Sequence, residues 1–282
     1  MVLPGCCSPA ARASDRRAAR TVTAEDELVL LARRFTGMAA LAAMGAALVA
    51  AGCGGGAHGD PVDASIDAPS GPCGSNAVFT GEQVDWDSTD SDTGFCGVQG
   101  AKWTVRGDAT ATGTTATPPN GRFVLCVPHQ AQTLVDITPP TATSGCLHAD
   151  GTPYPRRGVA IASEAVIAAG GAFSARAMTQ ARETAMFTQV GAGYSATQAQ
   201  LVVHVNGTPR AVSISANHAP AQQFDGTSWR AAPDGDAPVG SDVLFPNVDP
   251  GTVTITVTGG AVGATTVSLE ADRFTYVAVI AH

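Results

Sequence analysis

The sequence predicts an all-β fold. We expect two antiparallel β-sandwich modules joined by a partly helical segment, after a signal peptide and a flexible tether. Thr, Val, Ala and Gly dominate the chain beyond residue 53, and only 5% of the whole chain is aromatic. Short segments alternate apolar and polar side chains, which is typical of half-buried strands. Turn-forming pairs such as Asn120-Gly121 precede or separate these segments.

Residues 33–53 have the pattern of an export signal. Arg33 and Arg34 are followed by a weakly apolar stretch of 15 residues, Gly37 to Ala51. A membrane-spanning helix needs about 20 apolar residues, so the stretch fits a cleaved secretory segment better than an uncleaved transmembrane anchor. The motif Ala50-Ala51-Gly52-Cys53 resembles the bacterial lipobox, which implies cleavage before Cys53 and acylation of that residue. A buried helix with an incidental cysteine is the alternative, and the Gly-, Pro- and Asp-rich sequence that follows disfavours it.

Residues 1–52 are therefore the expected signal region, within which residues 1–28 are unusual. They contain four arginines and an acidic run that an ordinary signal lacks. Our hypothesis is that the true start lies downstream, near Val29 or Leu30. Bacterial lipoproteins carry more than one acyl chain, which implies a stable membrane anchor. We therefore expect the protein to be lipid-anchored in the cell envelope. Because Gly54 rather than Asp follows the cysteine, we expect the anchor to lie in the outer membrane.

The mature chain, residues 53–282, is acidic. Its 230 residues contain 10 basic and 20 acidic side chains, so the formal charge is 10 − 20 = −10. Nucleic-acid binding needs a basic surface, so nucleic acid is excluded as an expected partner. The acidic balance also argues against electrostatic docking to anionic lipid, so we expect membrane contact through the lipid anchor.

Four cysteines follow the lipidated one, namely Cys73, Cys96, Cys126 and Cys146. An even number of cysteines in an exported chain predicts two disulfides, for which three pairings are possible. We prefer Cys73–Cys96 with Cys126–Cys146, because this pairing closes short local loops. Free thiols or a zinc site remain alternatives, although no Cys-x-x-Cys spacing is present.

Composition divides the mature chain into four segments. Residues 53–75 are rich in Gly, Pro, Ser and Asp, which predicts a lipidated flexible tether. Residues 76–146 are the expected first sandwich module, with strands near 78–79, 98–105, 122–128 and 133–138. In the third of these, Phe123, Leu125 and Val127 share one face and Cys126 points to the other, because side chains alternate along a strand.

Residues 147–198 are the expected connecting segment, and residues 199–282 the second module. A helix is predicted near 177–190, with Met178, Ala181, Ala185 and Met186 on one side and Gly191 as its C-cap. Strands of the second module are expected at 201–205, 211–215, 243–245, 252–257, 265–269 and 274–280.

The segment Asn120-Gly-Arg-Phe-Val-Leu-Cys-Val-Pro, followed by Thr133-Leu-Val-Asp-Ile-Thr, resembles the carboxypeptidase regulatory-like, or transthyretin-like, β-sandwich module. Val243-Leu-Phe-Pro-Asn-Val-Asp-Pro-Gly-Thr-Val-Thr-Ile-Thr-Val resembles the same element in the second half. The resemblance implies antiparallel sandwiches that act as spacers or contact domains at bacterial surfaces. It implies no catalytic residues.

One acidic cluster could hold a cation. Asp85, Asp87, Asp90 and Asp92 lie within eight residues, and carboxylate oxygens are ligands for calcium. The spacing departs from the EF-hand loop, so a solvated loop is the favoured interpretation. No other cofactor is expected.

Catalytic motifs are absent from the sequence. It has no Gly-x-Ser-x-Gly elbow, His-Glu-x-x-His pair or phosphate loop. The six mature histidines show no metal-ligand spacing, and His204, within an alternating strand, is expected to face water. Trp229 follows a turn-rich stretch and is the best candidate for an exposed, ligand-contacting aromatic residue, although packing in a hairpin is the safer interpretation.

These observations favour a non-enzymatic protein of the envelope. The leading expectation is a structural or interaction module that contacts a protein or glycan. A carbohydrate-binding accessory lipoprotein is the alternative, and exposure of Trp86 or Trp229 would favour it. An envelope hydrolase with a dispersed site is a third interpretation, which would need a base and a nucleophile in one pocket.

Overall fold

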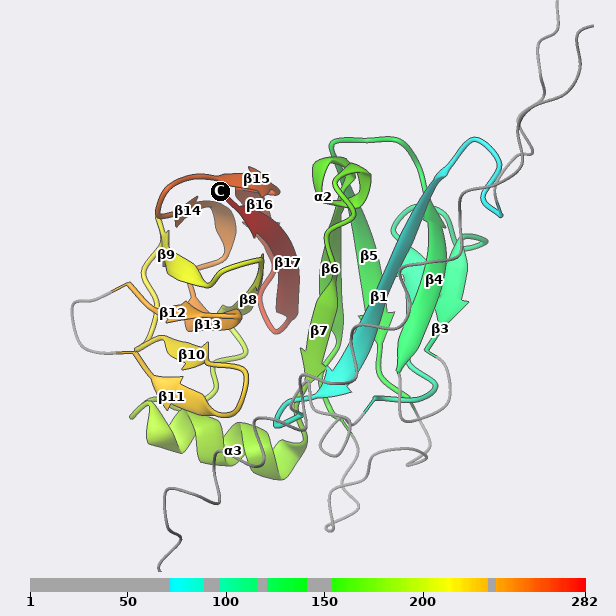
Figure 1. The fold of residues 1–282 in the computed structure, drawn as a ribbon. Helices are drawn as coiled ribbons and strands as arrows, with labels where there is room; N and C mark the ends of the chain where they lie inside the picture. Colours follow the sequence, from blue (N-terminus) through cyan, green and yellow to red (C-terminus); the bar gives the residue numbers. More distant parts are fainter. Residues whose placement is uncertain (1–71, 89–96, 116–120, 141–153, 233–236) are drawn as a thin grey trace, which may run out of the picture. The chain divides into compact units, whose positions relative to one another are not determined.

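The computed structural model describes residues 72–88, 97–115, 121–140, 154–232 and 237–282 (Figure 1). The expected signal, Cys53 and nearly all of the tether lie outside these residues. In the described part, no helix has the length and apolar character needed to cross a membrane. The described residues belong to one compact unit.

The fold class is confirmed, since the described chain consists mainly of strands (Figure 1). The elements are β1 (Ala77–Asp85), β2 (Lys102–Val105), β3 (Thr112–Thr114), β4 (Arg122–Val127), β5 (Gln132–Thr138), β6 (Gly158–Ser163), α2 (Glu164–Ala168), β7 (Ser174–Ala177), α3 (Gln180–Gln189), β8 (Ala199–Asn206), β9 (Arg210–Ile214), β10 (Gln222–Phe224), β11 (Trp229–Ala231), β12 (Val239–Gly240), β13 (Asp242–Val248), β14 (Gly251–Val257), β15 (Ala261–Gly263), β16 (Thr266–Leu269) and β17 (Phe274–Ala281).

A ten-stranded sheet runs through the whole described chain. Its order is β11-β10-β13-β8-β17-β6-β5-β2-β3, and β15 pairs with the end of β17. The last strand, β17, lies between β8 and β6 and pairs with both in parallel (Figure 1). The sheet is therefore mixed rather than wholly antiparallel as expected. It also crosses the boundaries expected at residues 146 and 198, because it takes strands from all three segments.

Two smaller sheets accompany the ten-stranded sheet. One has three strands in the order β4-β1-β7, and the other has four in the order β12-β9-β14-β16. The three-stranded sheet also contains a parallel pair, β1 with β7, next to the antiparallel pair of β1 with β4.

The ten-stranded sheet has an apolar core on each face. Ala160 and Ala162 of β6 belong to the first core, whereas Ile161 between them belongs to the second. Strand β17 alternates in the same way, with Tyr276 in the first core and Val277 in the second. Strands buried on both faces carry continuous apolar runs, which explains the uninterrupted sequences of β6 and β17.

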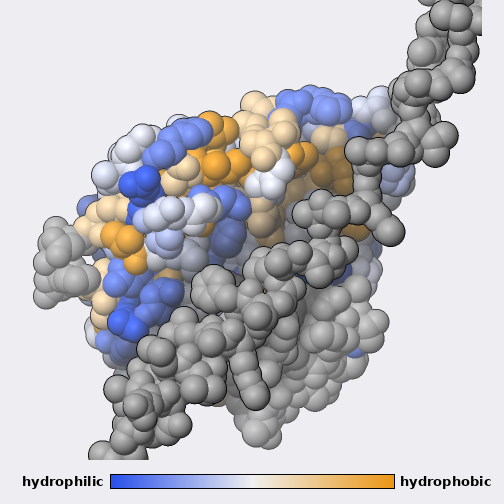
Figure 2. Space-filling view, viewed as in Figure 1, coloured by the Kyte–Doolittle hydropathy of each residue, from blue (hydrophilic) through white to orange (hydrophobic). Residues whose placement is uncertain are grey.

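The first core lies between the ten-stranded sheet, the three-stranded sheet and α3. Phe123 and Leu125 of β4 point into it, as the alternation in the sequence predicts, and Val124 between them is exposed. Trp103 of β2 stacks on Phe123 at a ring-centroid distance of 3.8 Å. Figure 2 shows one face of the molecule, on which hydrophilic and hydrophobic residues are interspersed over the described part.

The second core is closed by the four-stranded sheet. Val253, Ile255 and Val257 of β14 are buried in it, while the threonines between them are exposed. Burying every second residue is the pattern that the sequence predicts for this strand. The turn at Asn206-Gly207 is also present, but it does not form a hairpin. Strand β8 before it belongs to the ten-stranded sheet and β9 after it to the four-stranded sheet.

The predicted helix is present as α3, although it starts at Gln180 rather than near 177. Its buried side also differs from the expected one, because Glu183 is buried whereas Ala181 and Ala185 are exposed. Thr179 caps its start, accepting a hydrogen bond from the backbone N–H of Arg182. Gly191 has a φ of +68°, and the N–H groups of Gly191 and Ala192 donate to the carbonyls of Thr188 and Phe187. This is a Schellman motif, which confirms Gly191 as the residue that ends the helix.

The close packing at the start of β4 requires a glycine at position 121. Gly121 has a φ of +52°, and a Cβ atom there would lie 2.2 Å from the carbonyl oxygen of Gln83. The same close approach lets the N–H of Gln83 donate to the Gly121 carbonyl at 2.9 Å. Gly121 thus allows the close approach of the backbone to Gln83 at the start of the pairing of β4 with β1.

Candidate functional site

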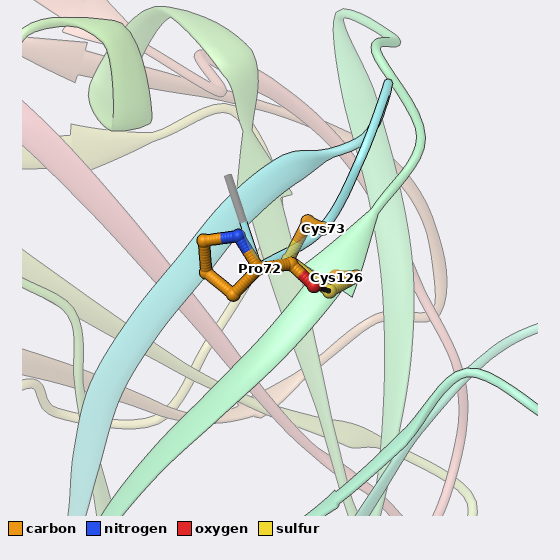
Figure 3. Close-up of a disulfide and its surroundings, with 3 residues drawn as sticks. All are labelled: Pro72, Cys73 and Cys126. Carbon is orange, nitrogen blue, oxygen red and sulfur yellow. Dashed lines mark hydrogen bonds between the residues drawn. A yellow bond between two sulfur atoms is a disulfide. The ribbon is translucent and has the colours of Figure 1, made fainter. Parts of the chain in front are cut away.

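A disulfide closes the junction between the expected tether and the fold. Cys73 and Cys126 are bonded, with their Cα atoms 5.3 Å apart (Figure 3). The preferred pairing of Cys73 with Cys96 and of Cys126 with Cys146 is therefore wrong. Cys96 and Cys146 themselves lie outside the described residues.

The strand register explains the observed pairing. Strands β1 and β4 run antiparallel with Ala77 opposite Val127, so the residues just before β1 lie beside the end of β4. Cys126 points away from the first core, as predicted, and is partly exposed on the side where Cys73 arrives. Distance along the chain was therefore a poor guide, because pairing of strands brings together cysteines 53 residues apart.

The acidic cluster is only partly described. Asp85 is buried and accepts hydrogen bonds from the Tyr154 hydroxyl at 2.9 Å and from the Asp87 backbone N–H at 3.1 Å. Asp87 is exposed and pairs with the Nε of Arg182 at 2.9 Å. Asp90 and Asp92 lie outside the described residues. No group of three potential metal ligands occurs in the described part, and calcium binding stays a prediction.

Trp229 is not the exposed aromatic residue that the sequence suggested. Its exposure is 9%, and its ring stacks on that of fully buried Trp86 at a centroid distance of 4.1 Å. Its indole N–H donates to the Trp86 carbonyl at 2.8 Å. The short β10–β11 hairpin thus uses Trp229 to close the first core, which is the packing role. Neither tryptophan is presented to solvent for sugar stacking.

A cleft of about 570 Å³ opens between two of the sheets. It is lined by β1, β4 and β7 of the three-stranded sheet and by β8 and β13 of the ten-stranded sheet. Thr80, Ser174 and Ser241 line it, together with the charged residues Glu82 and Arg122. Phe123, Val124 and Phe173 also line it, so a cleft with both apolar and polar walls is available to a small ligand or a side chain of a partner.

Three charged or titratable side chains meet at the wall of this cleft. The side chain of Asp242 in β13 is 1% exposed. One of its carboxylate oxygens accepts a hydrogen bond from the Nε of Arg176 at 2.6 Å. Its other oxygen lies 2.8 Å from the Nδ1 of His204, the residue opposite it on β8. Arg176 also donates to the carbonyls of Ser88 and Trp86, and its guanidinium lies 4.0 Å from the centre of the Phe224 ring. Arg176 therefore connects β7 to β13 across two sheets.

The carboxylate of Asp242 stays ionised. Burial alone would raise its pKa, but the charges and hydrogen bonds of Arg176 and His204 outweigh burial and lower the pKa to about 2. Since an ionised carboxylate only accepts hydrogen bonds, the Nδ1 of His204 carries a proton. Arg176 and Asp242 together form a neutral buried pair.

Sequence reasoning missed this group. His204 was expected to face water, yet its side chain is 18% exposed and bonded to Asp242. A signal did exist, because Arg176 and Asp242 each lie in or beside an apolar run. A charged residue in a fully buried strand needs a partner, but the sequence does not say which one.

Comparisons with known proteins do not assign the chain to a family. No protein-family model matches it, and no curated protein matches it. Among solved structures, a match is a double mutant of the shaft pilin SpaA from Lactobacillus rhamnosus GG. The identity is 14% and the TM-score 0.18, with 74% of this chain and 98% of the pilin chain covered. At that TM-score the likeness supports no conclusion about fold or function.

Proposed function

We propose that this chain is a lipid-anchored envelope protein whose folded part is a non-catalytic structural or interaction module. The anchor is Cys53 at the end of the export signal, and the tether of residues 53–75 separates it from the first strand. The observation that carries the proposal is the Cys73–Cys126 disulfide, which lies where the tether meets the fold.

The disulfide supports export, because such bonds form and persist in oxidising compartments such as the periplasm and the cell surface. It also suits a domain attached to a membrane at its N-terminal end. Without it, a pull on the tether would peel β1 from β4, starting at Ala77 opposite Val127. With the disulfide, a force applied to the tether is transmitted from Cys73 to Cys126 in β4, so the pairing of β1 with β4 does not carry it alone.

The cleft supports contact with a partner rather than catalysis. The charges of Arg176 and Asp242 neutralise each other, and both side chains are almost fully buried. Such a pair fixes the relative position of β7 and β13 and so gives the cleft a rigid wall. We propose that this wall, together with the exposed parts of β1 and β4, contacts an envelope protein. The alternative function, carbohydrate binding, is less well supported, because Trp86 and Trp229 stack on each other inside the protein and are not available to contact a sugar.

Membrane fractionation of the full chain in a bacterial host tests the anchor. The native chain should sediment with the membrane and be released by detergent but not by high salt. Cys53→Ser should appear in the soluble exported fraction, whereas Cys96→Ser, the control, should stay with the membrane. Release of the native chain by salt alone, or membrane retention of Cys53→Ser, would contradict the proposal.

A second measurement tests the role of the disulfide. The double variant Cys73→Ser/Cys126→Ser should remain membrane-bound but be cleaved faster than the native chain when protease is added to intact membranes. Equal cleavage rates would argue against a protective role at the tether junction.

A further inference from the structure

One end of the fold gathers the helix α2 and the ends of several strands. Strands β6, β8 and β17 run parallel to one another, so Ser163, Asn206 and Ala281 all lie at this end. Strand β15 lies there too, because Ala261 is opposite Ala281. Figure 1 shows α2, β15 and the end of β17 at the top of the molecule and α3 at the bottom. We call this end the α2 end.

The expected tether joins the fold at the α2 end. The start of β1 lines a small pocket together with Val166 and Ile167 of α2, so the first strand begins beside this helix. Cys73, four residues before β1, is bonded to Cys126 near the end of β4. The chain that leads to Cys53 therefore leaves the fold at the α2 end and not at the end that carries α3.

The surface of the α2 end is apolar and lacks charge over long stretches of sequence. Neither residues 165–175 nor residues 251–269 contain a charged side chain. Figure 2 shows hydrophobic residues where Figure 1 places α2 and β15, with hydrophilic residues at the margin. Five apolar side chains of α2, the turn after it, β15 and β17 are exposed or half-exposed, and we call them the apolar face: Ile167, Ala168, Ala169, Val262 and Ile280.

The apolar face belongs to one packed surface. A Cβ atom on Gly263 of β15 would lie 3.0 Å from a methyl carbon of Val166, so β15 packs directly against α2. Asn206 fixes the chain that follows α2. Its Oδ1 accepts from the N–H of Ala172 at 2.7 Å, and its Nδ2 donates to the Ala172 carbonyl at 3.0 Å. The face is therefore already formed before it contacts any partner.

We infer that the apolar face rests on the membrane in which Cys53 is anchored. The inference depends on the proposed lipid anchor and adds to it an orientation of the folded part. The 20 residues from Cys53 to Pro72 are Gly-rich, and a flexible chain of this length spans about 25 Å on average. An anchor at that distance keeps the α2 end near the lipid. Because the effective concentration is then high, a contact too weak to bind a free protein is sufficient.

The contact is apolar rather than electrostatic. The mature chain has a formal charge of −10, so anionic lipid does not attract it. Glu164 at the start of α2 pairs with the Nδ1 of His129 at 2.8 Å, and both side chains are exposed. These polar groups lie beside the apolar face, where lipid headgroups can solvate them. We therefore expect the contact to form on uncharged phosphatidylcholine and to resist high salt.

Tryptophan fluorescence of the lipidated full chain in phosphatidylcholine vesicles tests the inference. The native residues Trp86, Trp103 and Trp229 are buried, so lipid brominated near the headgroup should quench them little. Ala168→Trp and Val262→Trp should each add fluorescence that is lost in brominated vesicles, and high salt should not restore it.

Ala271→Trp is the matched control. Ala271 is also an exposed alanine, but it precedes β17 at the opposite end of the fold. The eight residues of β17 separate it from the α2 end by about 25 Å. Its added fluorescence should therefore be unchanged by brominated lipid.

Sedimentation of the same samples with the vesicles separates this inference from the proposed anchor. If the chain sediments but brominated lipid quenches Ala168→Trp and Ala271→Trp equally, or quenches neither, the inference is overturned and the anchor stands. If the chain does not sediment, both are overturned. Protection of Ala168→Trp from aqueous iodide without quenching by brominated lipid would mean that a protein covers the apolar face, which also overturns the inference.

Discussion

Replacing Asp242 by Asn tests whether the Arg176–Asp242 pair holds the two sheets together. The substitution keeps the shape of the side chain but removes its charge, which leaves Arg176 buried and uncompensated. It also places an amide N–H₂ where the carboxylate accepted from both Arg176 and His204. Breaking one partner of a buried ion pair costs about 3–5 kcal/mol, so we expect the free energy of unfolding to fall by about 3 kcal/mol.

The pH dependence provides an independent check on that magnitude. The pKa of Asp242 falls from 3.8 to about 2 on folding. A carboxylate whose pKa is lower in the folded state stabilises the fold above about pH 4, and this contribution is lost as the pH falls towards about 2. The shift corresponds to about 2 kcal/mol. The Asn variant should lack this part of the acid dependence.

Urea unfolding of the full chain measures both effects, with Asp87→Asn as the matched control. Asp87 also pairs with an arginine, but its side chain is 44% exposed. A surface ion pair contributes at most about 1 kcal/mol. If the two variants unfold at the same urea concentration, the account of a buried clamp between β7 and β13 fails.

Three further predictions concern other parts of the fold. The double variant Cys73→Ser/Cys126→Ser should lower the free energy of unfolding by about 4 kcal/mol, because the disulfide closes a loop of 53 residues. A loss of less than about 1 kcal/mol, measured by urea unfolding, would refute this stabilising role. Trp229→Ala should cost about 3–5 kcal/mol, because the ring is buried; unchanged stability would mean that the ring is exposed after all. Glu183→Gln should speed amide hydrogen exchange in α3, since it removes the charge that pairs with Arg156; slower or equal exchange would contradict this.

Much of the local structure could be predicted from the sequence. Phe123 and Leu125 face the first core, and Val253 and Ile255 face the second. Both pairs follow from the alternation of apolar and polar residues along the sequence of each strand. Helix α3 and its end at Gly191 follow from local signals as well. These features depend only on neighbours within a few positions.

The arrangement of strands could not be predicted in the same way. Strand β17 lies between β6 and β8 through parallel pairing, and a parallel neighbour leaves no turn or spacing signal in the sequence. Its continuous apolar run reflects burial on both faces, which is equally compatible with several positions in a sheet. The expectation of two modules rested on the resemblance between the segments beginning at Asn120 and Val243, which says nothing about pairing between distant strands.

The candidate site shows the same division. Packing in a hairpin was the safer interpretation for Trp229 and is what the structure shows, but the sequence did not identify the stacking partner Trp86, which is 143 positions away. The Cys73–Cys126 bond and the Arg176–Asp242 pair likewise join distant segments. Local patterns identified residues that need partners, whereas the partners were fixed by sheet topology.

The most direct test of the central proposal is mass spectrometry of the chain purified from its native membrane, followed by non-reducing peptide mapping. We expect an N-terminus at Cys53 carrying acyl chains and a linked peptide pair that contains Cys73 and Cys126. An unlipidated chain beginning upstream of Cys53, with Cys73 and Cys126 as free thiols, would contradict both the anchor and the disulfide at its junction with the fold.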